Sequence, residues 1–208
     1  MIVAVDGPTA SGKGTIARAI AALYRLPHLD TGLLYRAVGR QVELAGGDPD
    51  DEAAMLAACA FDEALLADPA LRSEIVGGLA SRVSIHPAVR AELFDRQRAF
   101  ATQPGGAVLD GRDIGTVIAP EATVKLYVTA SIPARARRRF LERRQRGEAV
   151  SLTAIEADLH HRDARDAGRA NAPLRMASDA LLLDNSELTP EQSVAAALAL
   201  VAAGLTRR

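Results

Sequence analysis

The chain has 208 residues and few of the residue types that mark several classes of protein. Cys59 is its single cysteine, so no disulfide forms within the chain, and a reducing cytoplasm is the expected location. Aromatic residues make up 3% of the sequence, which argues against binding single-stranded nucleic acid by base stacking. The longest apolar stretch, 194–205, is too short to cross a bilayer. We therefore expect neither a membrane nor a nucleic-acid partner.

Lysine is also scarce, because Lys13 and Lys125 stand against 23 arginines. Neither lysine follows an asparagine, so the Asn-Lys-x-Asp pattern that reads guanine is absent, and a switch-type GTPase is disfavoured. Arginine binds phosphate and carboxylate through two parallel hydrogen bonds, as lysine cannot. Genome composition explains the arginine total equally well, so only the positions of the arginines argue for function.

The strongest motif is a phosphate-binding loop at the N-terminus. A buried strand is predicted over 2–6, and an amphipathic helix from about 15 to 24. The glycines between them let successive backbone N–H groups face an anion, and the helix N-terminus adds partial positive charge. Lys13 is expected to reach the outer phosphates of a nucleoside triphosphate. The residues expected to bind ATP in this loop are Gly7, Pro8, Thr9, Ala10, Ser11, Gly12, Lys13, Gly14 and Thr15.

One position departs from the commonest form of this loop. Gly14 follows the lysine where Ser or Thr usually holds magnesium, and the hydroxyl comes one residue later on Thr15. Mg²⁺ is therefore expected to keep mostly water and phosphate ligands, with Thr15 and Asp110 contacting it through water. For Asp110 a helix cap and an ion pair with Arg112 are nearly as probable.

The alternation of apolar runs with helical stretches predicts an α/β fold. Buried strands are expected at 2–6, 27–30, 107–110, 124–130 and 180–184. Helices between them favour a five-stranded parallel sheet with helices on both faces. Capping boxes are predicted at Thr189 with Gln192, and at Thr153 with Glu156.

Two stretches interrupt this alternation within a single predicted domain, 1–208. The first, about 46–104, has no clear strand, an acidic beginning and a basic end, and is expected to be a monophosphate-binding insert. The second, about 134–169, carries seven arginines within residues 135–146 and is expected to be a lid. The core then comprises 1–45, 105–133 and 170–208.

An arginine run on a helix is usually a solvated face or a partner-binding surface. After a kinase-like loop, we favour a lid that places guanidinium groups against the transferring phosphoryl group. Spacing alone does not separate the individual arginines; Arg138 is the one that we expect to contact ATP.

Further motifs complete a pattern that covers nearly the whole chain. Because the carboxyl ends of parallel strands meet at one crevice, the segments after the second and third strands are expected beside the phosphate loop. In order, the motifs read GPTASGKGT, LDTGLLYRA, VRAELFDRQRAF, LDGRDIGTVIAP and RDARDAGRANAPL. With them the chain resembles the bacterial cytidylate kinases, a group of nucleoside monophosphate kinases that transfer phosphate from ATP to CMP or dCMP.

This resemblance implies the CMP site. Thr31, Arg36, Arg112 and Arg169 would hold the CMP phosphate, Ser81, Arg90 and Asp113 would read the base, and Arg162 and Asp166 would hold the ribose. A carboxylate beside an arginine complements the N4 donor and the N3 and O2 acceptors of cytosine. The segment 48–82 is shorter and more helix-like than in many members of the family, and Gly168 stands where an asparagine is expected.

The function expected is ATP-dependent phosphorylation of CMP and dCMP with Mg²⁺, by a monomer. Catalysis would rest on positioning and on charge neutralisation by Lys13, Arg112 and Arg169, because the acceptor phosphate, with a second pKa of about 6, needs no general base. The alternatives are a P-loop kinase of another small acceptor, such as UMP, AMP or shikimate, and an Arg-rich nucleic-acid-binding module that uses a nucleoside triphosphate.

Overall fold

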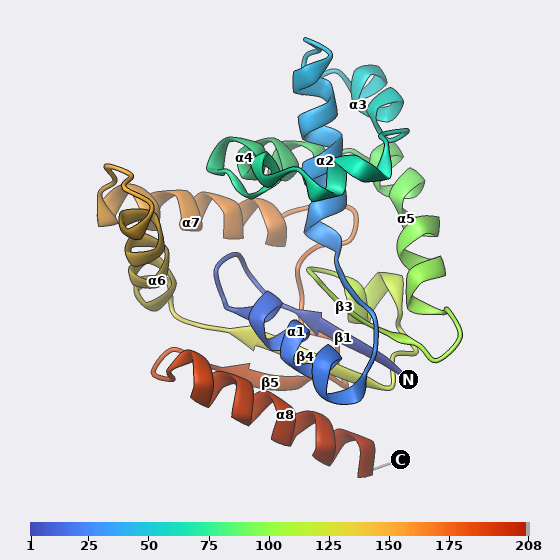
Figure 1. Ribbon diagram of the computed structural model, residues 1–208, viewed down its shortest axis with the longest axis vertical. Coiled ribbons are helices and arrows are strands. Elements are labelled where there is room, and N and C mark those ends of the chain that lie inside the picture. Colours follow the sequence, from blue (N-terminus) through green and yellow to red (C-terminus); the bar gives the residue numbers. More distant parts are fainter. Residues whose placement is uncertain (207–208) are drawn as a thin grey trace. The chain divides into compact units, whose positions relative to one another are not determined.

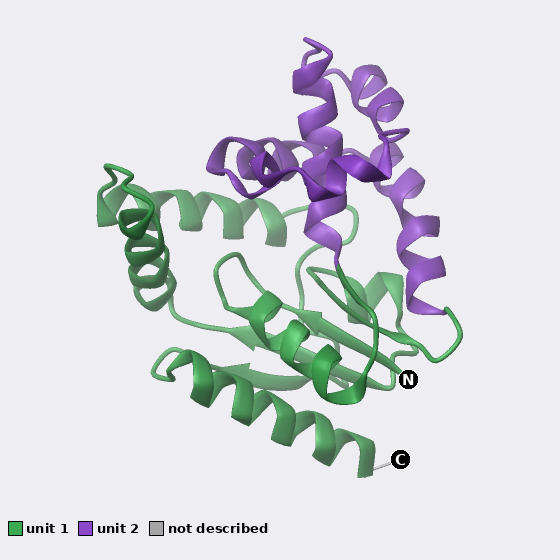
Figure 2. Ribbon diagram, in the orientation of Figure 1, with its two compact units in different colours: residues 1–29, 103–208 green, residues 30–102 purple. Residues whose placement is uncertain are grey.

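The computed structural model describes residues 1–206 and divides the chain into two compact units (Figures 1 and 2). Unit 1 comprises Met1–Leu29 and Gln103–Arg208, and unit 2 comprises Asp30–Thr102. In the described part of the chain, no helix is both long enough and apolar enough to span a membrane.

A five-stranded sheet organises the fold, with the strand order β2-β3-β1-β4-β5. The pairs β1–β3, β1–β4 and β4–β5 are all parallel. The five predicted strands are confirmed, with boundaries that differ from the predicted ones by at most one residue at each end. The strands are β1 (Ile2–Asp6), β2 (His28–Asp30), β3 (Ala107–Gly111), β4 (Val124–Thr129) and β5 (Leu181–Asp184).

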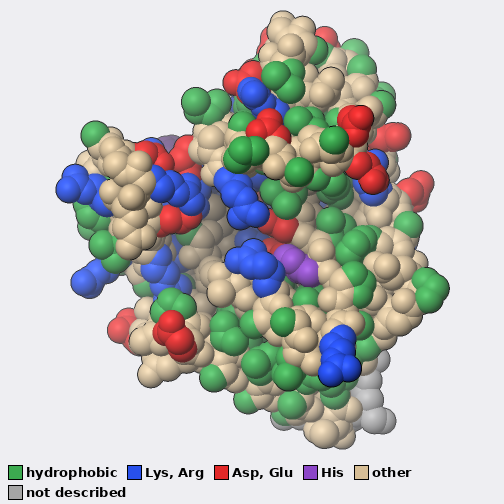
Figure 3. All heavy atoms as spheres, viewed as in Figure 1, with side chains coloured by type: hydrophobic (Ala, Val, Ile, Leu, Met, Phe, Trp, Pro, Cys, Tyr) green, Lys and Arg blue, Asp and Glu red, His purple; other side chains and the backbone are tan. Residues whose placement is uncertain are grey.

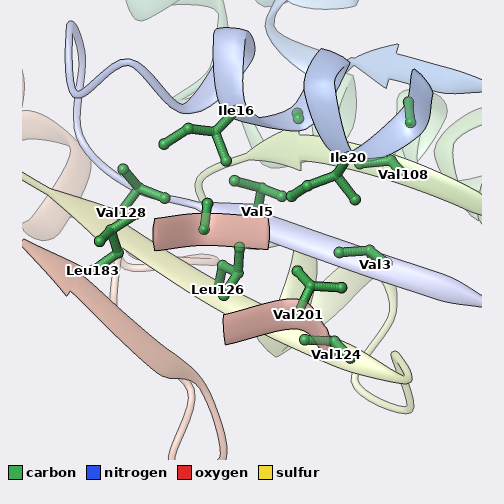
Figure 4. Packing of buried hydrophobic residues seen from close by; sticks show 13 residues of the cluster. Val3, Val5, Ile16, Ile20, Val108, Val124, Leu126, Val128, Leu183 and Val201 are labelled. Carbon is green, nitrogen blue, oxygen red and sulfur yellow. The ribbon is translucent and has the colours of Figure 1, made fainter. Parts of the chain in front are cut away.

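Two helices cover one face of the sheet and enclose the main core of unit 1. These are α1 (Lys13–Tyr24) and α8 (Pro190–Thr206), which pack against each other and against the central strands. Ile16 and Ile20 of α1 meet alternate residues of the strands (Figure 4). Alternation follows from the strand geometry, in which successive side chains point to opposite faces. The strand residues that Figure 4 labels in this core are Val3, Val5, Val108, Val124, Leu126, Val128 and Leu183.

The opposite face of β1 carries Asp6 and packs against a short turn of π-helix, η3 (Ile114–Ile118). Asp6 neighbours Val5 in sequence and therefore points away from the α1 side. Its carboxylate accepts hydrogen bonds from the backbone N–H groups of Ile114 (2.9 Å) and Gly115 (2.8 Å). The carboxyl end of β1 thus fixes the segment that follows β3.

Apart from Asp30, the last residue of β2, the regular secondary structure of unit 2 is helical. The absence of strand patterns predicted this for most of its length. Asp30 caps α2 by accepting a hydrogen bond from the Gly32 N–H, and Pro87 opens the long α5. The helices are α2 (Thr31–Leu44), α3 (Glu52–Ala58), the 3-10 turns η1 (Glu63–Ala67) and η2 (Pro69–Arg72), α4 (Glu74–Val83) and α5 (Pro87–Ala101).

The arginine-rich region of unit 1 forms α6 (Ile132–Gln145) and α7 (Leu152–Ala167), which pack together. The capping box predicted at Thr153 and Glu156 is wrong, because α7 begins earlier: Ser151 accepts a hydrogen bond from the Ala154 N–H and is the true cap. Both residues then lie inside the helix.

The capping box predicted for α8 is confirmed. The Gln192 N–H donates to Thr189 Oγ1 (3.2 Å), and the Thr189 N–H donates to Gln192 Oε1 (2.9 Å). The two residues thus satisfy each other's backbone donors at the start of the helix.

Candidate active site

The phosphate-binding loop runs from the end of β1 to the start of α1, as predicted. Two positions need glycine. A Cβ on Gly7 would lie 2.0 Å from the Val128 carbonyl oxygen, so β4 leaves no room for a side chain. Gly12 caps α1 with a φ of 85°, in the left-handed region, and Ala10 also has a positive φ of 61°. The loop is therefore tightly shaped by its neighbours.

Lys13 begins α1 and its side chain turns back over the loop. Its Nζ lies 3.4 Å from the Pro8 carbonyl oxygen and donates to it. Its charge also lowers the pKa of both Asp6 and Asp166, although it is a minor contributor at each. The lysine of the loop therefore lies near the carboxylates of the site.

Asp110 is the penultimate residue of β3 and lies beside the start of α1. A Cβ on Gly14 would lie 3.7 Å from Asp110 Oδ2, so position 14 faces this carboxylate. The other oxygen, Oδ1, is hydrogen-bonded to His28 Nε2 at 2.7 Å. His28 is therefore the partner of a buried acid.

This arrangement fits a magnesium ion that keeps most of its water. Among residues 1–206, no cluster of three or more histidine, cysteine or acidic side chains could enclose a metal. Mg²⁺ dehydrates reluctantly and is commonly held by one or two carboxylates together with substrate phosphates. Asp110, almost fully buried and facing the first turn of α1, supplies one carboxylate of that kind.

Asp6 is the most strongly perturbed acid beside the loop. Burial raises its pKa from 3.8 to about 6, although the hydrogen bonds from Gly115 and Ile114 partly oppose this effect. The nearby Asp113 carboxylate raises it further. The Asp6 carboxylate, at 5% exposure, thus accepts two backbone hydrogen bonds that favour its ionised form.

A network of arginines and one aspartate joins the loop to the segment after α7. Arg112 donates from Nη2 to Thr9 Oγ1 (2.7 Å) and from Nε to Asp166 Oδ2 (2.9 Å). Arg169 donates to the other oxygen of Asp166 (2.7 Å). Burial disfavours the ionised form of Asp166, but the two guanidinium groups outweigh this effect, and its pKa lies below the ordinary value. Two of the three arginines predicted to hold the CMP phosphate, Arg112 and Arg169, therefore share one carboxylate.

The remaining predicted residues of unit 1 lie on α7 and after β3. Arg162 is buried and pairs with Asp158 one turn earlier (2.9 Å). Asp113 is also buried, directly before η3. Of the predicted ribose residues, Asp166 thus contacts the phosphate-side arginines, whereas Arg162 pairs within its own helix.

In unit 2, Thr31 and Arg36 both lie on α2. Thr31 is its first residue and is buried. The guanidinium of Arg36 donates to the carbonyl oxygens of Leu71 (2.6 Å) and Ser73 (3.0 Å), and it lies against Gly77, where a Cβ would approach Arg36 Nη2 to 2.9 Å. Arg36 is thus docked on the chain that leads into α4.

Ser81 and Arg90 of unit 2 are connected through Ser84 at the end of α4. Ser84 Oγ donates to the Ser81 carbonyl oxygen (3.1 Å), and Arg90 Nη1 lies 3.5 Å from the Ser84 carbonyl oxygen and donates to it. Arg90 is buried, and its guanidinium lies 5.6 Å from the centre of the Tyr35 ring. The two predicted base-reading residues of this unit therefore lie close together.

Lys and Arg side chains gather over α6 and α7 on the face seen in Figure 3. Many of them are paired locally: Arg139 and Arg146 both contact Glu142, and Arg143 contacts Glu148. Arg138, predicted to bind ATP, donates to Asn185 Oδ1 (3.0 Å) directly after β5. The acidic partners reduce the net positive charge that a nucleic-acid surface would need.

Sequence reasoning missed four residues that organise this site: Asp6, His28, Arg135 and Asn185. Arg135 bonds Asp163 on α7 and the Thr9 carbonyl, and Asn185 bonds the Ser11 carbonyl. Asp6 and Asn185 each follow or end a strand beside the loop, which is a usable signal in parallel sheets. Arg135 had no signal that distinguished it from its arginine neighbours.

A parallel α/β sheet with a phosphate-binding loop after its central strand, and arginines at the carboxyl ends of its strands, defines a P-loop kinase. The sequence profile described as "Cytidylate kinase" matches residues 3–203. The chain belongs to the cytidylate kinase family, a conclusion that confirms the resemblance and assigns phosphorylation of CMP.

Individual relatives agree with the family profile. The chain is 56% identical to a cytidylate kinase of Caulobacter sp. strain K31 over 96% of this chain and 93% of the relative. It is 58% identical to a cytidylate kinase of Xanthobacter autotrophicus over 98% of both chains. A solved structure of an uncharacterized protein from Eubacterium ventriosum shares the fold, with a TM-score of 0.56 at 12% identity, covering 100% of this chain and 99% of that one.

Proposed function

We propose that the protein transfers the γ-phosphoryl group of ATP to CMP and dCMP, with Mg²⁺ as the metal. The observation that carries this proposal is the Arg112 guanidinium, which bonds the loop residue Thr9 and the carboxylate of Asp166 at once. The loop expected to hold the donor phosphates and the arginines expected to hold the acceptor phosphate are thereby part of one network. Such a network supports in-line transfer between two anionic groups.

The metal would be held by few protein groups. Thr15, in the first turn of α1, and Asp110, whose Oδ2 faces position 14, would contact it through water. When bound, Mg²⁺ neutralises charge on the donor phosphates. The protein's own part is to keep the Asp110 carboxylate in one orientation, which the hydrogen bond from His28 supports.

Catalysis of the phosphoryl transfer is assigned to positively charged side chains and to the positioning of the two nucleotides. The acceptor phosphate has a second pKa of about 6, so at neutral pH its oxygen is already a nucleophile. Lys13 would bind the transferring group, and Arg112 and Arg169 would offset the negative charge of the two nucleotides. Asp166 keeps both guanidinium groups in place and, with its lowered pKa, remains ionised at neutral pH.

Selection of cytosine is assigned to Asp113, Ser81 and Arg90, which would pair with the polar edge of the base. Asp113 and Arg90 are buried, so a base with reversed donors and acceptors would leave them unpaired, which is costly. Thr31 and Arg36 would bind the phosphate and Arg162 the ribose. We also propose that the protein acts as a monomer in the cytoplasm.

The test is phosphoryl transfer from ATP, with and without Mg²⁺, to CMP, dCMP, UMP, AMP and shikimate. We expect CMP and dCMP to be the preferred acceptors and the rate to depend on the metal. Preference for UMP, AMP or shikimate would contradict the assignment of the base-reading residues. Efficient transfer in the presence of EDTA would contradict the role given to Mg²⁺.

A further inference from the structure

Two carbonyl groups of the phosphate-binding loop are held by side chains from outside it. Arg135 Nη1 donates to the Thr9 carbonyl oxygen (3.0 Å), and Asn185 Nδ2 donates to the Ser11 carbonyl oxygen (2.9 Å). We propose that Arg135 and Asn185 are positioning residues that aim the N–H groups of Ala10 and Gly12 at the phosphates of the bound nucleotide. This inference rests on the proposed binding of ATP by the loop.

The geometry of the peptide bond connects each carbonyl to the next amide. In a trans peptide the C=O and the following N–H point in opposite directions within one plane. Holding the Thr9 carbonyl therefore fixes the direction of the Ala10 N–H, and holding the Ser11 carbonyl fixes that of the Gly12 N–H. Within residues 1–206, neither N–H donates to a backbone carbonyl, so both are available to an anion.

Asn185 is itself held rigidly. It is 1% exposed and lies directly after β5, and its own N–H donates to the Thr129 carbonyl at the end of β4 (2.9 Å). Its Oδ1 accepts a hydrogen bond from Arg138 (3.0 Å), which prevents the side-chain amide from turning over. The Nδ2 group therefore stays directed at Ser11.

Arg135 is fixed in the same manner, at 3% exposure. Its Nε donates to the Ala130 carbonyl oxygen (2.9 Å), and its other end forms a two-pronged ion pair with the Asp163 carboxylate of α7. With these groups satisfied, the remaining Nη1 hydrogen bond reaches Thr9. This arginine is thus committed to the protein, unlike an arginine that must reach a nucleotide.

Orientation before binding matters because a donor that already points at the ligand needs no rearrangement when the anion arrives. A loop that loses one of these two hydrogen bonds must orient the N–H group of Ala10 or Gly12 when the ligand binds. Loss of the effect of one hydrogen bond corresponds to a decrease in affinity of about tenfold. This decrease in affinity is expected only for ligands whose phosphates bind the loop, and not for adenosine.

The decisive variant is Asn185→Leu, which keeps the size and neutrality of the side chain but removes both hydrogen bonds. It is measured in the wild-type chain and in an Arg138→Met chain, because Asn185 also contacts Arg138. Gln97→Leu is the matched control: Gln97 is 1% exposed and its amide also donates to a backbone carbonyl, that of Leu93 (3.0 Å). Dissociation constants for ATP and adenosine are measured by calorimetry with Mg²⁺ present, and unfolding is followed in parallel.

We expect Asn185→Leu to weaken ATP about tenfold in both chains and to leave adenosine unchanged. Gln97→Leu should lower stability without changing ATP affinity. An unchanged ATP affinity in Asn185→Leu, an effect that disappears in the Arg138→Met chain, or equal weakening of adenosine would overturn the inference. If the wild-type chain fails to bind ATP, the proposed function fails instead.

If Asn185→Leu does not fold, Arg135→Lys tests the inference through the other hydrogen bond, that from Arg135 to the Thr9 carbonyl oxygen. Lysine keeps the charge but lacks the planar fork, so it cannot bond Thr9 and Asp163 together. The same ATP-specific weakening supports the inference, and wild-type affinity in a folded Arg135→Lys chain overturns it.

Discussion

Asp6 offers a sharp test of the electrostatics beside the loop, because burial raises its pKa from 3.8 to about 6. A pKa that is higher in the folded state means that the contribution of Asp6 to stability is fully present below pH 3.8 and is lost as the pH rises through about 6. The unfolded and folded pKa values of Asp6 differ by about two, and a difference of one corresponds to about 1.36 kcal/mol. Ionisation of this carboxylate therefore lowers the free energy of unfolding at pH 7 by about 3 kcal/mol relative to acid pH.

The perturbation is Asp6→Asn, which removes the titrating group. Asparagine accepts from only one of the two backbone donors, Ile114 or Gly115, so the variant also loses a hydrogen bond at every pH. The free energy of unfolding is measured by urea denaturation from pH 4 to pH 7.5 for both proteins. The variant should be less stable at pH 4, and the difference should shift in its favour by about 2.5 kcal/mol between pH 4 and pH 7, because a small part of the effect is already lost at pH 4.

Asp184→Asn serves as a control of opposite sign. Asp184 is exposed and accepts hydrogen bonds from the Oγ (2.6 Å) and N–H (2.9 Å) of Ser186, which lower its pKa. Its contribution is therefore present above the ordinary pKa and lost in acid, so its difference curve should slope the other way. A difference between Asp6→Asn and wild type that does not change with pH would refute the reasoning.

Further substitutions test glycine positions and a helix cap. Gly7→Ala should abolish detectable ATP binding in calorimetry and lower the free energy of unfolding by about 2 kcal/mol or more, because its Cβ would lie 2.0 Å from the Val128 carbonyl oxygen. Gly78→Ala, where a Cβ would have no atom within 4 Å, should instead stabilise α4 by about 0.5–1 kcal/mol. Equal effects of the two substitutions on ATP binding and on thermal unfolding would contradict this prediction. Thr189→Ala should lower stability by about 1 kcal/mol through loss of the α8 cap while leaving kcat unchanged, and an unaltered melting temperature would show that the cap contributes nothing.

Strands and the phosphate loop could be predicted because their signals are local. Short apolar runs that end in Asp6 or Asp110 reveal buried parallel strands, and Gly7 to Lys13 has few alternative interpretations. The α7 cap was misassigned because Ser151 and Thr153 are both good caps, and only the backbone path decides between them.

The connections within the site could not be predicted, because they depend on distant parts of the chain. Nothing near His28 in sequence indicates Asp110, 82 residues away, and nothing near Asn185 indicates Ser11, 174 residues away. Burial is equally invisible in sequence, so the raised pKa of Asp6 could not be anticipated.

The central claim is that fixed cations and geometry drive the transfer without a proton-abstracting side chain. The most direct test is the single-turnover rate at saturating ATP and CMP for Lys13→Ala and for Asp113→Asn, the buried carboxylate assigned to the base. We predict that Lys13→Ala slows transfer by about 10²-fold or more, while Asp113→Asn weakens CMP binding but stays within about tenfold of the wild-type rate. A carboxylate variant that abolishes transfer while Lys13→Ala retains it would contradict the account.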